Sequence, residues 1–174
     1  SPLYQLVGGK CNNEVPVYGY GMMLQEKSVD ELVVLFKEES KQIKSKNFKA
    51  MKMKVGLGPK EDLKLVQAVR ESVGKDFKLM VDANHAYNLK DALYVGKGLD
   101  ELDVFWFEEP VAPEDYEGYR ELKQKISTSI AGGEAEFTKY GWNKLISNKC
   151  IDIAQPEVCG LGGITEYLKV AALA

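Results

Sequence analysis

Short apolar runs alternate with longer polar stretches in which apolar residues recur every three or four positions, and this alternation continues along the whole chain. The apolar runs are rich in β-branched and aromatic residues, which predicts strands. Six such runs lie near residues 15–21, 48–55, 77–82, 104–109, 127–134 and 150–157. Strands that are mostly apolar are typical of a parallel sheet covered by helices. The chain is therefore expected to be an α/β protein.

Helix start and stop signals flank the periodic stretches between these strands. Ser28 and Glu31 form a capping box, and Asn88 is a suitable cap for a later helix. Pro59 opens another helix, for which Gly74 is a natural end. Further helices are expected from about Pro113, Thr138 and Thr165. The pattern as a whole predicts about six strand–helix units.

Two architectures are compatible with repeated strand–helix units. An open, doubly wound sheet places its site at one switch point, built from only two or three loops. A closed barrel uses the C-terminal end of every strand, and here four consecutive strands each end in a charged residue. This favours a TIM-type (β/α) barrel. A full eight-stranded barrel needs about 250 residues, so the fold predicted for these 174 residues is a partial barrel that lacks the last strands.

Composition and charge limit the classes of partner and the cellular compartment expected for this chain. The chain is 45% hydrophobic and 28% charged, as in soluble globular domains. The net charge of −3, with both signs interleaved and no basic stripe, argues against a nucleic-acid partner, and no apolar run is long enough to cross a membrane. Three cysteines without a CxxC pair are expected to be buried thiols in a reducing compartment, which favours the cytoplasm.

Three carboxylates recur at one interval. Asp82, Glu108 and Glu134 each follow a predicted strand, and successive members are 26 residues apart. Because the C-terminal strand ends of a barrel converge on one mouth, equal intervals are expected to bring the three together. Carboxylates that close cannot all ionise unless a cation holds them. The spacing therefore predicts a divalent-metal site.

The preceding strand supplies two lysines on one face. Strand alternation puts Lys52 and Lys54 on one side and Met51, Met53 and Val55 on the other. The apolar side suits packing against helices, so the lysines are expected to point into the barrel, where they need anionic partners. The alternative is an edge strand with solvated lysines. Beside a second ammonium and a metal cation, Lys54 should have a lowered pKa and so be a candidate base.

Together these motifs resemble the barrel domain of the enolase superfamily, in its mandelate racemase-like branch. Lys52-Met-Lys54 is similar to the KxK motif of that branch. The resemblance implies that Lys54 is the catalytic base. It also implies that Lys52 binds the substrate carboxylate and tunes its neighbour. Residues 1–14 look like the linker that leaves the family's N-terminal capping domain, with 15–174 as the partial barrel domain.

The acidic residues carry the second part of the resemblance. Asp82 in VDAN, Glu108 in EEP and Glu134 in GGE sit where the family places its three magnesium ligands. Asn84 matches a position that commonly contacts substrate. The cofactor implied is therefore Mg²⁺.

The stretch after the sixth strand departs from the family pattern. Glu157 stands where the branch usually has an Asp, and the histidine that normally pairs with it on a seventh strand is not in this sequence. Glu157 is therefore a candidate catalytic residue that would orient such a histidine. His85, the only histidine, follows the third strand beside the metal ligands and is expected to have a supporting role.

The resemblance implies an enzyme that uses Mg²⁺ to remove the proton α to a carboxylate through an enediolate. The first expectation is dehydration of an acid sugar, an aldonate or aldarate, by a homo-oligomer. A racemase or epimerase, or a lactone cycloisomerase, is the alternative within the branch. From another class, the chain could be a non-catalytic partial barrel whose open sheet edges favour association.

Overall fold

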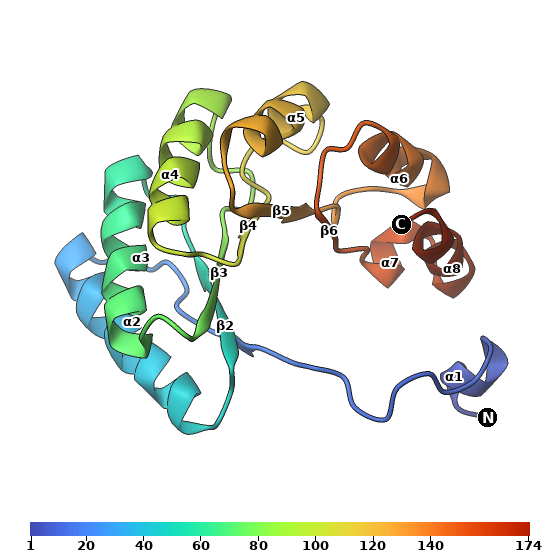
Figure 1. The fold of residues 1–174 in the computed structure, drawn as a ribbon, viewed down its shortest axis with the longest axis horizontal. Helices are drawn as coiled ribbons and strands as arrows, with labels where there is room; N and C mark the ends of the chain where they lie inside the picture. Colours follow the sequence, from blue (N-terminus) through green and yellow to red (C-terminus); the bar gives the residue numbers. More distant parts are fainter.

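The computed structural model describes residues 1–174 and contains one sheet of six parallel strands in the order β1-β2-β3-β4-β5-β6. The strands are β1 (Gly19–Tyr20), β2 (Ala50–Lys54), β3 (Lys78–Asp82), β4 (Trp106–Glu108), β5 (Ser129–Gly132) and β6 (Ile153–Ala154). Each strand pairs with the next one along the chain. A doubly wound sheet would reverse its order at a switch point. The partial barrel is therefore confirmed, and Figure 1 shows it as an open arc.

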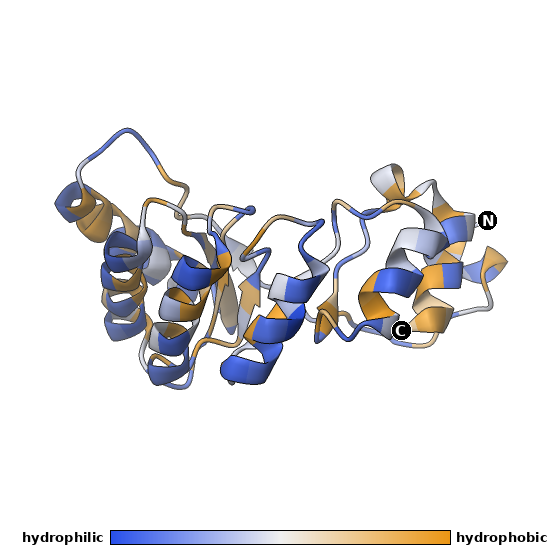
Figure 2. Ribbon diagram, turned by 90° about the horizontal axis from the view of Figure 1, so that it is seen from above, coloured by the Kyte–Doolittle hydropathy of each residue, from blue (hydrophilic) through white to orange (hydrophobic).

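Helices cover the outer side of this arc (Figure 1). They are α2 (Val29–Ser45), α3 (Pro59–Val73), α4 (Leu89–Glu101), α5 (Tyr116–Lys125), α6 (Thr138–Ser147), α7 (Val158–Leu161) and α8 (Ile164–Leu173), whereas α1 (Leu3–Leu6) lies off the arc, in the N-terminal segment. Most of them show one hydrophilic and one hydrophobic side in Figure 2, as expected of helices that cover a sheet. None is long and apolar enough to cross a membrane.

The helix signals in the sequence are confirmed at most ends. Ser28 and Glu31 form both hydrogen bonds of the capping box, and Asn88 caps α4. Gly74 ends α3 with φ of 85°, a conformation that glycine adopts without steric cost. The helix expected from Pro113 begins slightly later, because the Asp115 side chain accepts the Gly118 N–H and so caps α5.

Strand alternation separates two apolar layers. The residues of β2 and β3 that face the helices, such as Met51, Met53 and Val81, are fully buried in a core of 30 residues. On the inner side a second, smaller cluster consists of Met80, Trp106 and Ala131. The inner surface therefore holds few apolar side chains, which leaves room for the charged residues of β2, β3 and β4.

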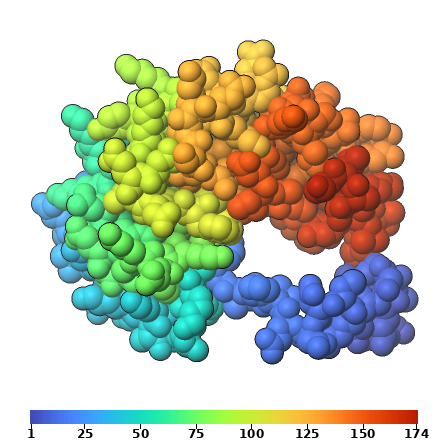
Figure 3. Space-filling view, in the orientation of Figure 1, coloured from blue at the N-terminus to red at the C-terminus, as the bar shows by residue number.

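The N-terminal segment contributes no buried residue to this packed body. Residues 1–18 are all exposed, and they extend from β1 toward the side where α8 lies (Figures 1 and 3). The strand expected near 15–21 shrinks to the two residues of β1, since Pro16 lacks the N–H that a strand interior requires. The assignment of residues 1–14 as a linker stays a prediction.

The expectation of three buried cysteines is wrong for two of them. Cys150 is buried, whereas Cys11 and Cys159 are exposed, and all three are free thiols. Cys11 lies in the exposed N-terminal segment, and Cys159 lies in the short helix α7, where only Leu161 is buried.

Candidate active site

Strand register brings the predicted charged residues together at one end of the sheet. Lys54 pairs with Asp82 across β2 and β3, and Asp82 pairs with Glu108 across β3 and β4. These three residues therefore form one row across adjacent strands. The interval between Asp82 and Glu108 in the sequence corresponds to one complete strand–helix unit, and so they become neighbours.

Both lysines point inward and contact these carboxylates. Lys52 Nζ lies 2.6 Å from Glu108 Oε1 and 3.1 Å from Asp82 Oδ2. Lys54 Nζ lies 2.6 Å from the same Asp82 oxygen and also donates to Asn84 Oδ1. The inward direction of the lysines is thus confirmed, and the solvated edge strand is excluded. The four charged groups hold one another in place.

The pKa values of this cluster follow from burial and from these contacts. Burial alone would lower the pKa of Lys52, but its contacts with Glu108 and Asp82 outweigh burial and raise it. The pKa of Lys54 is likewise raised, because the hydrogen bond and charge of Asp82 outweigh burial. The lowered pKa expected for Lys54 assumed a bound metal cation and left out direct contact with Asp82, so for the metal-bound site it stays a prediction. Burial acts to raise the pKa of Asp82, but the two lysines hold it low.

Glu108 has more hydrogen-bond partners than the sequence indicated. Besides Lys52, its side chain accepts a hydrogen bond from Trp106 Nε1 at 3.1 Å and from Gln155 Nε2 at 2.9 Å. Burial still raises the pKa of Glu108, and the nearby Asp82 charge adds to that effect. Trp106 lies two residues before Glu108 on the inner face of β4, so strand alternation could have identified it. Gln155 gave no comparable signal.

A second buried acid, Glu109, was also missed. Its side chain is 1% exposed, and both carboxylate oxygens lack a hydrogen-bond partner. His85 Nε2 lies 3.2 Å from Glu109 Oε2 but makes no hydrogen bond with it. Burial raises the pKa of Glu109 to about 7, with further contributions from the charges of Glu134, Asp82 and Glu108.

The structure places Glu134 differently from the other two predicted metal ligands. Its side chain is exposed, and it makes no ion pair or hydrogen bond with the cluster. The residue level with Glu108 on β5 is Ala131, so Glu134 lies three residues further along, beyond the strand end at Gly132. Equal intervals in the sequence therefore did not give equal positions in the sheet.

Two further predicted residues can be placed. Asn84 lies at the mouth, where its side chain accepts from Lys54 and its backbone N–H donates to Asp82 Oδ1. Glu157 is exposed and accepts the Gly160 N–H, which makes it the cap of α7 and lowers its pKa. Glu157 contacts none of the lysines or carboxylates at the mouth. Its proposed catalytic role stays a prediction.

The ligand chemistry of the mouth fits a divalent cation. No three His, Cys, Asp or Glu side chains lie close enough to share a metal ion in this structure. Even so, the mouth carries four carboxylates and two ammonium groups, namely those of Asp82, Glu108, Glu109, Glu134, Lys52 and Lys54. When all are ionised, two negative charges are in excess. Carboxylate oxygens are the ligands that Mg²⁺ prefers, so the residues present fit this ion by charge and donor type.

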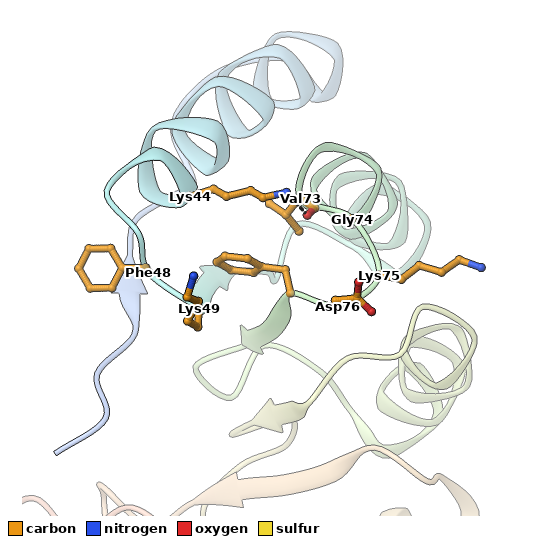
Figure 4. A pocket seen from close by; sticks show the side chains of 8 residues that line it. Lys44, Phe48, Lys49, Val73, Gly74, Lys75 and Asp76 are labelled. Carbon is orange, nitrogen blue, oxygen red and sulfur yellow. Dashed lines mark hydrogen bonds between the residues drawn. The ribbon is translucent and has the colours of Figure 1, made fainter. Parts of the chain in front are cut away.

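A separate cavity of about 390 Å³ lies at the opposite ends of the strands (Figure 4). It is lined by Lys44, Phe48, Lys49, Val73, Gly74, Lys75, Asp76 and Phe77. Lys44 Nζ donates to the Val73 carbonyl oxygen across it at 2.7 Å. In parallel barrels the catalytic groups lie at the C-terminal strand ends, so this cavity is not part of the candidate site.

Comparison with known proteins agrees with this geometry. Residues 35–174 match the family model described as "Enolase C-terminal domain-like". The D-galactarolactone cycloisomerase of Agrobacterium fabrum is 37% identical over 97% of the chain, which covers 44% of that protein. The chain thus spans about half the length of the curated relatives that it matches.

Solved structures share the fold closely. The 3,6-anhydro-D-galactonate cycloisomerase from Zobellia galactanivorans has a TM-score of 0.91 and 45% identity, with 98% of this chain and 46% of that one covered. The L-talarate dehydratase from Polaromonas sp. JS666, in complex with Mg and L-glucarate, has a TM-score of 0.82 and 29% identity, with 99% and 47% covered. Both similarities extend over nearly all of the chain.

Proposed function

The chain belongs to the enolase superfamily, in its mandelate racemase-like branch, and from this membership we propose that the full-length protein removes the proton α to the carboxylate of a small acid with the aid of Mg²⁺. One observation carries the proposal. Lys54, Asp82 and Glu108 form a row across three strands, with Lys52 bridging the two acids. A base and metal-ligating carboxylates are the groups that this chemistry requires.

We assign the proton transfer to Lys54. Its amine is at the C-terminal end of β2 and is more exposed than that of Lys52, with 14% against 10% of the side chain accessible. Asn84 contacts the Lys54 amine, so a substrate that binds beside that amine would also contact Asn84. Lys52 stays fixed between Asp82 and Glu108, and its charge favours an anionic substrate at the mouth.

Asp82, Glu108 and Glu134 would hold the Mg²⁺. When bound, the ion would stabilise the second negative charge that develops on the carboxylate as the α-proton leaves. Two of the three proposed ligands already share a cation, because Lys52 Nζ contacts both Asp82 and Glu108. Glu134 lies next along the chain at the same mouth, although it is exposed. The magnesium reported in the L-talarate dehydratase structure supports the choice of Mg²⁺ as the ion.

We further propose an acid sugar as the substrate, and a cycloisomerase ahead of the dehydratase expected from the sequence. Three proteins named as cycloisomerases match at 36% to 45% identity, whereas four named as dehydratases match at 29% to 36%. The two reactions share their chemistry. In each, the C–H bond α to the carboxylate breaks, its electron pair forms a C=C bond, and the C–O bond at the β-carbon breaks. In cycloisomerisation that oxygen belongs to a ring and stays attached to the molecule when the ring opens, whereas in dehydration it takes up a proton and leaves as water.

The test uses the full-length protein with Mg²⁺ in deuterated water. The panel contains sugar lactones, anhydro-sugar acids and open-chain aldonates and aldarates, and NMR follows both α-proton exchange and product. Lys54→Ala should lose exchange, whereas Lys64→Ala should keep it, because Lys64 is exposed and pairs with Asp30 on the surface. Exchange that persists in Lys54→Ala would remove this lysine from its role. Magnesium binding without exchange on any substrate would favour a non-catalytic protein instead.

A further inference from the structure

One buried acid lies outside the row of charged strand ends. Asp62, in the first turn of α3, has 0% exposure and no cationic partner. Its Oδ1 accepts the backbone N–H of Gly56 at 3.0 Å and of Leu57 at 3.2 Å. Its Oδ2 accepts the N–H of Gly58 at 2.9 Å and the Tyr87 hydroxyl at 2.7 Å. Four hydrogen bonds on one carboxylate compensate for its burial.

These four bonds join the loops that follow the strands of the site. Residues 56–58 come directly after Lys54 and Val55 at the end of β2. Tyr87 belongs to the loop after β3, three residues beyond Asn84. The Tyr87 N–H also donates to the Pro110 carbonyl oxygen at 3.2 Å, in the loop after β4. A single side chain on α3 therefore connects, directly or through Tyr87, three loops at the mouth.

The loops need such support because their backbone is unusual. Gly56 has φ of 130°, and a Cβ there would lie 2.9 Å from the Ala86 Cβ, so the loops after β2 and β3 are in close contact. Asn84 and His85 have φ of 43° and 65°, values that residues other than glycine rarely adopt. Conformations of this kind persist only where the surroundings hold them in place. The Asp62 carboxylate provides bonds on one side of this contact and the Tyr87 hydroxyl on the other.

We propose that Asp62 is a positioning residue for the proton transfer, acting through residues 56–58 on Lys54 and through Tyr87 on Asn84. This inference rests on the proposed function. Lys54 is the last residue of β2, so the direction in which its side chain leaves the strand depends on the loop that Asp62 holds. A displacement of about 1 Å at a reacting group can cost on the order of 100-fold in rate. Substrate binding, which depends on the charges at the mouth, should change much less.

The other end of the same helix offers a matched control. Arg70 is 8% exposed and donates to five backbone carbonyl oxygens, those of Leu102, Gly74, Lys75, Phe77 and Asp103. It is a buried charged residue of α3 that anchors loops, as Asp62 is, but it lies at the end of the barrel away from Lys54. Arg70→Met should destabilise the fold without changing the chemical step.

Steady-state kinetics of the full-length protein with Mg²⁺ separate the two roles. Asp62→Ala should lower kcat by about 100-fold with KM changed by less than about threefold, and should raise the deuterium isotope effect for substrate labelled at the α-carbon. Asp62→Asn keeps an oxygen acceptor for Gly56 and Leu57 and should lie between Asp62→Ala and wild type, as should Tyr87→Phe, which loses one of the four bonds. Arg70→Met should lower Tm but keep kcat within about twofold.

Hydrogen exchange of the backbone amides, read by mass spectrometry, tests the inference without turnover. Exchange of residues 55–58 and 83–87 should be faster in Asp62→Asn and Tyr87→Phe than in wild type and unchanged in Arg70→Met. Kinetic losses in Asp62→Asn that merely follow Tm, or equal losses in Arg70→Met, would overturn the positioning role. If wild type removes no α-proton from any substrate, the proposed function fails, and hydrogen exchange alone decides whether Asp62 fixes these loops.

Discussion

Replacing Lys52 with Met tests whether this lysine compensates the buried carboxylates of the site. Lys52 is 8% exposed, and its amine contacts Glu108 at 2.6 Å and Asp82 at 3.1 Å. Methionine keeps most of the side-chain volume but removes the charge. Asp82 retains Lys54 as a cationic partner, whereas Glu108 retains only the neutral donors Trp106 and Gln155. Most of the lost stability should therefore come from Glu108, whose carboxylate would have no cationic partner.

Breaking a buried ion pair by removing one partner typically costs about 3 to 5 kcal/mol of stability. Trp106 and Gln155 still hydrogen-bond the carboxylate, so a loss near 3 kcal/mol in the free energy of unfolding is expected at pH 8. The loss should shrink as the pH falls, because a protonated Glu108 no longer needs a cation. Its folded pKa is already raised by burial, and removing Lys52 raises that pKa further.

The sign of the pH dependence follows from proton binding. Between the unfolded and the raised folded pKa of Glu108, the native state binds more protons than the unfolded state, so stability falls as the pH rises through that range. In Lys52→Met this pH range is wider. The free energy of unfolding should therefore be further below that of wild type at pH 8 than at pH 5. Mg²⁺ should restore more stability to the variant than to wild type, since a bound cation returns the missing charge.

Urea unfolding of the full-length protein without and with Mg²⁺, followed by tryptophan fluorescence at both pH values, measures these differences. The control is Lys64→Met, which breaks an ion pair with Asp30 of the same 2.6 Å length but exposed to solvent. Exposed pairs are screened by water, so this variant should stay close to wild type. A Lys52→Met protein as stable as wild type at pH 8, or a deficit independent of pH, would refute the compensating role.

Three further substitutions have definite expected outcomes. Glu109→Gln should raise stability at pH 8 on the order of 3 kcal/mol and flatten the pH dependence between about 4.5 and 7 in urea unfolding, because wild-type stability falls as the buried acid ionises. Gly56→Ala should cost about 1 to 3 kcal/mol by the same assay, from positive φ and the contact with the Ala86 Cβ. Glu108→Gln should weaken Mg²⁺ binding by at least about tenfold in calorimetry, because the ligand charge is lost while the shape is kept.

The sheet was predictable because its signals are local and repeated. Each strand is a short apolar run, and each helix carries its own cap, as at Ser28 and Asn88. In a barrel, order along the chain is also order in the sheet, so no long-range information was needed. Strand lengths were overestimated at both ends of the sheet, where β1 and β6 have two residues each. Those strands have a partner on one side only, and fewer neighbours keep the chain extended.

The site was predictable to the level of strand ends but not of side-chain partners. Lys54, Asp82 and Glu108 lie level because each is the last residue of its strand and the three strands are paired side by side. Glu134 lies outside β5 because that strand ends at Gly132. Asp62 gave no signal, since an acid in the first turn of a helix is ordinary. Its importance depends on the N–H groups of residues 56–58, and loop conformation is not encoded in hydrophobic spacing.

The raised pKa of Lys54 shows how its basicity depends on Asp82. The sequence argument gave Asp82 to the metal and left Lys54 beside another ammonium group, which would lower its pKa. In the structure Asp82 Oδ2 accepts a hydrogen bond from Lys54, forms an ion pair with Lys52, and so raises the pKa of Lys54. One carboxylate charge cannot fully stabilise the ammonium group and a divalent cation together. A cation that binds Asp82 must therefore lower the pKa of Lys54 and favour its neutral amine. Metal affinity and the basicity of Lys54 are thus linked in this row of residues.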